Sequence, residues 1–113
     1  SQLTKESEGD KELEDEKAKL LLYLQQGVVL GDYAEALHIP ERKLSVFINS
    51  TYGVSFKRWV NNKRVEYATE QMAKHPDYTM ERIAELSGFA HKSHFCKIFR
   101  EITGGSFTEY KNR

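Results

Sequence analysis

Apolar residues in this chain recur mainly at three- and four-residue intervals, the period of one face of an α-helix. The pattern predicts a first helix over residues 11–27, which ends at Gly27 and has its apolar positions at Leu13, Leu20, Leu21 and Leu24. A short second helix is expected at about residues 31–37, and a third from Glu41 to Tyr52. Pro40 favours the start of that third helix, because proline suits the first helical turn.

The longest predicted helix covers about residues 55–74. It follows the stop signal Gly53 and ends before Pro76, since the residue preceding a proline is pushed out of the helical region. The remaining predicted elements are a short helix from Thr79 to Leu86 capped by Thr79 or Asp77, a helix from His91 to Thr103, and a final turn around Phe107 and Tyr110. No useful stretch alternates like a strand, so we expect an all-α fold of about seven helices.

The two halves of the chain share one apolar pattern. The corresponding residues are Ala34, Leu44, Phe47 and Ile48 in the first copy and Ala84, Phe95, Ile98 and Phe99 in the second, which is one residue longer. Each copy has a short helix with a small residue where two helices would cross, a tight turn, and a helix with one apolar stripe. This is the anatomy of a helix-turn-helix unit, expected at about residues 31–52 and 79–103.

A DNA-binding helix must bury one side and present the other to the major groove. At 100° per residue, the outward side chains are Ser93, Lys97 and Arg100 in the second copy, with Cys96 on the flank, and Arg42, Val46 and Asn49 in the first. At 1.5 Å per residue, the helix over 55–74 would be ~30 Å long. Successive major grooves are ~34 Å apart, so the connecting helix could place one unit in each groove. A plain helical bundle with a pseudo-repeat is the alternative.

Charge is unevenly distributed along a chain whose formal net charge is zero. Residues 1–17 hold seven acidic residues and three lysines, a net charge of −4. Residues 18–113 hold 14 Lys and Arg against 10 Asp and Glu, a net charge of +4. The predicted division is therefore an acidic tail or linker over 1–17 and a modestly basic domain over 18–113. A DNA-mimicking, autoinhibitory role for the acidic segment is the alternative.

Several function classes find no support in the sequence. There is no Gly-rich phosphate loop, paired carboxylate site or nucleophile–base motif, so we predict no enzyme and no cofactor. His91, His94 and Cys96 are a poor metal set, and we expect no metal. No apolar run approaches the ~20 residues of a membrane span. The lone cysteine and the absence of a secretory signal fit a cytoplasmic protein.

The stretch IAELSGFAHKSHFCKIFREITGGSFTEYK resembles the C-terminal signature of AraC/XylS transcriptional regulators. The matching positions are Ile83, Ala84, Gly88, Phe89, Ser93, Phe95, Lys97, Phe99, Gly104, Ser106 and Tyr110. The stretch LSVFINSTYGVSFKRWVNNKRVEYA is similar to the family's first unit and linker through Leu44, Gly53, Phe56, Trp59, Arg64 and Ala68. The resemblance covers residues 20–111 and implies sequence-specific binding to duplex DNA as the output domain of a transcription factor.

The resemblance also implies roles for single residues. Base contacts would come from Arg42, Ser45, Val46, Lys92, Ser93, Cys96 and Lys97, and phosphate contacts from Lys43, Asn49 and Arg100. Two positions depart from the family pattern. Phe107 stands where proline is usual, so the last helix is expected to start differently, and Val46 stands where a polar or basic residue is common, so it would contact a thymine methyl or weaken the first unit.

The expected partners are duplex promoter or operator DNA and RNA polymerase. A sensing or dimerisation domain is expected outside this segment, because family members usually carry one and the chain does not begin with Met. Arg64 lies on the apolar line of the long helix, which favours a buried stem with a tethered guanidinium over DNA contact. The competing function is a helical protein–protein module that docks a partner around Val46.

Overall fold

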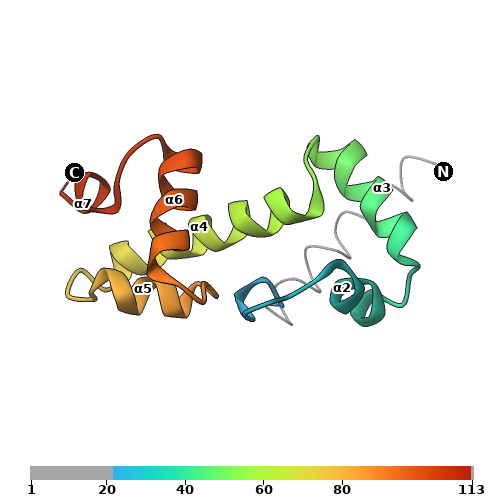
Figure 1. Cartoon of the computed structure of the whole chain (residues 1–113), viewed down its shortest axis with the longest axis horizontal. Helices are drawn as coiled ribbons and strands as arrows, with labels where there is room; N and C mark the ends of the chain where they lie inside the picture. Colours follow the sequence, from blue (N-terminus) through green and yellow to red (C-terminus); the bar gives the residue numbers. More distant parts are fainter. Residues whose placement is uncertain (1–21, 113) are drawn as a thin grey trace.

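The computed structural model describes residues 22–112, which form six α-helices and one short 3₁₀ helix, without strands (Figure 1). The elements are η1 (Leu22–Leu24), α2 (Leu30–Leu37), α3 (Glu41–Tyr52), α4 (Phe56–Lys74), α5 (Met80–Leu86), α6 (Lys92–Thr103) and α7 (Phe107–Lys111). The predicted all-α class, with two helix-turn-helix units joined by a long helix, is confirmed. The acidic segment 1–17 and most of the helix expected over 11–27 lie outside the described residues.

Two separate hydrophobic cores share the linker helix α4. The first core consists of Tyr33, Ala34, Leu44, Ile48, Trp59 and Val60, and the second of Val65, Ala68, Ile83, Ala84, Phe89, Phe95, Ile98, Phe99 and Phe107. The N-terminal half of α4 therefore belongs to the α2–α3 unit and its C-terminal half to the α5–α6 unit. Each unit buries its own apolar stripe, so the two units do not merge into one bundle.

Between the two cores, the middle of α4 carries buried polar residues. The Arg64 side chain is 8% exposed, and its guanidinium donates hydrogen bonds to the carbonyl oxygens of Tyr23 at 2.6 Å and Gln25 at 2.9 Å. Its guanidinium carbon also lies 5.4 Å from the centre of the Phe89 ring. The predicted role of a tethered, buried guanidinium is confirmed. Arg64 thus joins the segment before α2 to the turn of the second unit.

Gly88 brings the same N-terminal segment against the second unit. Its φ of 89° lies in the left-handed region, which glycine adopts without steric cost. A Cβ atom added here would lie 2.7 Å from the carbonyl oxygen of Leu24. Two constraints therefore favour glycine in this turn, its backbone conformation and the close approach of the Leu24 backbone.

The sequence repeat is also a repeat of backbone geometry. The amide of Ile39 donates to the Ala34 carbonyl at 3.0 Å, and the amide of Phe89 donates to the Ala84 carbonyl at 3.1 Å. The residues before these amides, His38 and Gly88, both have positive φ. The first turn tolerates histidine, because the His38 side chain is exposed there.

The repeat continues beyond the two recognition-helix candidates. Ser55 caps α4 by accepting a hydrogen bond from the Arg58 amide at 3.2 Å, and Ser106 caps α7 through the Glu109 amide at 3.1 Å. Phe107 is buried at the first position of α7, with its ring centre 6.0 Å from that of Phe95. The last helix therefore begins behind a serine cap, as α4 does, with a phenylalanine where proline was noted as usual.

Gly88→Ala and Gly53→Ala form a matched pair that tests the contact with Leu24. Both glycines have positive φ, but a Cβ at Gly53 would meet open space. Gly53→Ala is expected to lower the free energy of unfolding by about 1–2 kcal/mol, the cost of the left-handed conformation alone. Gly88→Ala is expected to cost about 1–3 kcal/mol more, because the Leu24 backbone must move. Urea unfolding of both variants measures the difference, and equal losses would contradict the close contact.

Candidate nucleic-acid interface

The residues expected to contact DNA lie on two helices, α3 and α6. Figure 1 shows these helices near opposite ends of α4, which crosses the middle of the molecule. The α3 set is Arg42, Lys43, Ser45, Val46 and Asn49, and the α6 set is Lys92, Ser93, Cys96, Lys97 and Arg100. All ten are exposed except Ser45 and Cys96, which are half-buried. The structure thus gathers the predicted residues into two surfaces, one on each unit.

The α3 surface combines cationic, amide and apolar side chains. Arg42 and Lys43 are exposed in its first turn, and Val46 is 60% exposed at its centre. The Asn49 amide donates to the Ser45 carbonyl at 3.0 Å, so this side chain is already engaged with its own helix. An exposed valine beside two cations can contact an apolar group such as a thymine methyl.

The α6 surface is more basic than the α3 surface. Ser93, Lys97 and Arg100 are all exposed, and within residues 22–112 neither Lys97 nor Arg100 has an ion-pair partner. Both cations border an open groove of about 680 Å³, whose lining also includes Ser106, Thr108 and the carboxylate of Glu101. Cations next to hydroxyl groups can bind phosphate oxygens or the acceptor atoms of base edges.

Lys92 differs from its neighbours because it is paired within the protein. Its ammonium nitrogen lies 3.0 Å from a carboxylate oxygen of Glu81, which belongs to α5. The hydrogen bond from Lys92 lowers the pKa of Glu81, and the same bond raises the pKa of Lys92. Both groups are exposed, so the pair adds little stability. The pair instead fixes the position of the Lys92 ammonium group in the protein without DNA.

Cys96 is turned furthest toward the protein among the residues expected on the α6 surface. Its sulfur lies 3.4 Å from the Met80 sulfur, and the side chain packs against the second core. A half-buried thiol can present only part of its surface to a base. Among residues 22–112, no group of three His, Cys, Asp or Glu side chains is placed to hold a metal ion.

Sequence reasoning missed the partner of Lys92 and the groove beside α6. Glu81 lies 11 residues before Lys92, and Ser106 lies on the far side of the α6–α7 turn. No local spacing rule connects such positions. The equivalence of Ser55 with Ser106 is, however, visible in the printed sequence as GVSF and GGSF. That repeat could have located Ser106 as a helix cap.

Comparison with known proteins identifies relatives with the same helical organisation. The model of a family described as a helix-turn-helix domain matches residues 33–113. Regulatory protein PocR of Salmonella typhimurium is 32% identical over 79 residues, which cover 70% of this chain and 26% of PocR. YijO of Escherichia coli, an uncharacterized HTH-type transcriptional regulator, is 30% identical over 80 residues, covering 71% of this chain and 28% of YijO. This chain thus spans about a quarter of the length of these relatives.

Solved structures share the fold. The C-terminal domain of AraT, a response regulator from Geobacillus stearothermophilus, superposes with a TM-score of 0.76 at 24% identity, over 89% of this chain and 84% of that one. The DNA-binding domain of the global transcriptional factor AdpA, solved in complex with a target DNA, gives a TM-score of 0.73 at 22% identity, over 88% and 89% of the two chains. Within the part of the chain that the structure describes, no helix is long and apolar enough to cross a membrane.

A pH titration tests the ion pair between α5 and α6. Lys92→Gln is expected to return the lowered pKa of Glu81 toward its ordinary range, as followed by NMR of the side-chain carboxyl carbon. The small stabilisation from the pair is present above the unfolded-state pKa of Glu81 and is lost as the pH falls through the folded-state pKa. Lys97→Gln, one turn further along α6, serves as the control and should leave the Glu81 titration unchanged. An unchanged titration in Lys92→Gln would show that the pair does not form in solution.

Proposed function

Because the chain belongs to the AraC-type helix-turn-helix family, we propose that it binds duplex DNA sequence-specifically as the output domain of a transcriptional regulator. In this proposal α3 and α6 enter successive major grooves on one side of the duplex. The observation that carries it is the presence of two exposed, polar helix faces on units joined by one continuous helix. A single chain can then contact two adjacent segments of the operator.

The dimensions of the linker helix support this geometry. α4 has 19 residues, which corresponds to about 28 Å at 1.5 Å per residue. The described molecule is 47 Å long and only 25 Å and 23 Å in its other two dimensions. Successive major grooves on one face of B-DNA lie ~34 Å apart. The molecule is therefore long enough to cover two grooves and thin enough to stay on one face.

The proposal assigns two kinds of contact to the two surfaces. Hydrogen bonds and apolar contacts to base edges come from Arg42, Ser45, Val46, Lys92, Ser93, Cys96 and Lys97. Phosphate contacts come from Lys43, Asn49 and Arg100. The exposure of eight of these ten side chains supports the assignment. Lys92 must leave Glu81 to bind a base edge. At an operator sequence that offers it no acceptor, the lost ion pair is not replaced, so binding is weaker and specificity increases.

The full-length protein is proposed to contain more than this DNA-binding domain. Since the chain spans about a quarter of its curated relatives, we propose that a sensing or dimerisation region lies elsewhere in the full-length protein. RNA polymerase is the proposed second partner, and the cytoplasm is the proposed location. The acidic segment 1–17 is proposed as the linker to that region.

Selection from a random-sequence duplex pool tests the proposed function directly. The 113-residue chain is expected to enrich a bipartite motif whose half-sites are centred about 10–10.5 base pairs apart, one helical turn. Selection should be repeated at two salt concentrations, because phosphate contacts make the affinity depend on salt. Salt-sensitive binding without an enriched motif would contradict sequence specificity, and no binding at either salt would contradict DNA binding by this domain.

Arg100→Ala and Lys97→Ala should weaken DNA binding in different ways. Arg100→Ala is expected to reduce affinity for all sequences alike and to lower the slope of log affinity against log salt by about 0.9, the value for one lost phosphate contact. Lys97→Ala is expected to relax the preference at one base pair by about 1–3 kcal/mol. Lys111→Ala, which removes an exposed cation outside α3 and α6, is the control. Equal, sequence-independent effects of all three variants would contradict the assignment.

A protein-docking module is the second candidate function, favoured by the 60% exposure of Val46. Loss of Lys97 or Arg100 would leave such a docking surface on the first unit intact. The two variants above therefore separate the candidates, because only DNA binding requires the basic surface of α6.

A further inference from the structure

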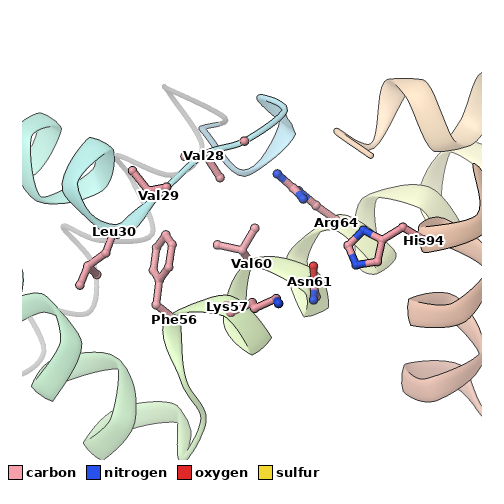
Figure 2. Close-up of a pocket in the computed structure, with 10 residues that line it drawn as sticks. Val28, Val29, Leu30, Phe56, Lys57, Val60, Asn61, Arg64 and His94 are labelled. Atoms are coloured by element: carbon pink, nitrogen blue, oxygen red, sulfur yellow. The ribbon is translucent and has the colours of Figure 1, made fainter. Parts of the chain in front are cut away.

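A cavity of about 300 Å³ lies between the two units and belongs to neither predicted DNA surface (Figure 2). Three elements border it, namely the segment 27–30 that leads into α2, one side of α4, and the first turn of α6 through His94. Cavities that bind small molecules begin at about this size. The cavity is thus large enough for a ligand, and both units contribute to its walls.

One half of the cavity is apolar. Figure 2 shows Phe56 and Val60 pointing from α4 toward the segment Val28, Val29 and Leu30. Val29 is 57% exposed, one of only two large apolar side chains with such exposure among the described residues. An apolar group seated here would remove surface from water at a gain of roughly 25 cal/mol per Å².

The other half of the cavity is polar, and no residue within 22–112 contributes a carboxylate to its lining. Lys57, Asn61 and Arg64 follow one side of α4, and His94 faces them from α6 (Figure 2). Asn61 is only 7% exposed, and its side-chain amide borders the cavity (Figure 2). These cationic side chains, together with the amide donor of Asn61, favour an anionic oxygen as the group that binds among them.

We propose that this cavity binds a small amphipathic monocarboxylate, with its carboxylate at Asn61 and Lys57 and its apolar tail against Phe56 and Val60. Arg64 adds positive charge at the inner end, although its own hydrogen bonds go to the carbonyls of Tyr23 and Gln25. A DNA phosphate would also satisfy Lys57 and Asn61. It would leave the apolar half unused, so the cavity favours the amphipathic ligand.

Occupancy of this cavity couples the two units. The ligand would touch the segment entering the first unit, the linker helix and the recognition-helix candidate of the second unit. A ligand that prefers one arrangement of the units shifts the molecule toward it. On the proposed DNA-binding function, such a shift would change operator affinity. Ligand binding itself is measured without DNA, so failure of one proposal is distinguishable from failure of the other.

Octanoate is a suitable probe, compared with octylammonium and octanol, which carry the same chain with a positive charge or no charge. Titration of the 15N-labelled 113-residue chain should shift the Asn61 side-chain amide and the backbone amides of Gly27 and His94. Octanoate is expected to bind at least about tenfold more tightly than either control, as a charge-assisted hydrogen bond implies. Tighter or equal binding of octylammonium or octanol, or shifts confined to other residues, would overturn the proposal.

Two matched pairs of variants locate the binding site. Asn61→Leu and Lys57→Gln should each weaken octanoate binding about tenfold, whereas Asn62→Leu and Lys74→Gln, on α4 but outside the cavity, should leave it unchanged. Thermal unfolding checks that each variant is folded. If Asn61→Leu does not fold, octanoate binding by Lys57→Gln is the test. If the chain binds no octanoate and Lys57→Gln lowers DNA affinity as Arg100→Ala does, the cavity belongs to the DNA surface and the proposal fails.

Discussion

The buried guanidinium of Arg64 is the contact on which the arrangement of the two units depends. A buried charge is unfavourable unless it is hydrogen-bonded, and burial accordingly lowers the pKa of this group. Arg64 meets the requirement by donating to the carbonyls of Tyr23 and Gln25. Those carbonyls hold the segment 22–26 across the middle of α4, where Leu24 lies against Gly88. Together with α4, this polar junction connects the two units.

The division of α4 into two apolar halves explains why the junction is polar. Trp59 and Val60 pack in the first core, and Val65 and Ala68 pack in the second. Continuous apolar packing through the middle would favour a single bundle, in which the faces of α3 and α6 could not both remain exposed. The arrangement instead keeps two small cores a fixed distance apart. Function follows from that separation, because each exposed helix face can then occupy its own groove.

The helices and the repeat could be predicted from the sequence, because they depend on local spacing and on stop signals such as Gly53 and Gly104. Even the burial of Arg64 could be inferred from its place on an apolar line. The carbonyl groups that accept its hydrogen bonds could not be predicted. Tyr23 lies 41 residues away, and every residue has a backbone carbonyl, so the sequence does not distinguish the acceptor. The Glu81 partner of Lys92 and the cavity beside Asn61 could not be predicted for the same reason. Both depend on how separate helices pack.

The most direct test of a fixed spacing between two DNA-contacting helices is the affinity for a selected operator after base pairs are inserted between its half-sites. An insertion of about five base pairs turns the second half-site to the opposite face of the duplex, and an insertion of about ten moves it one full turn further away. Both insertions are expected to reduce affinity to that of a single half-site, because a junction held by Arg64 cannot stretch by a helical turn. Full affinity after either insertion would contradict it.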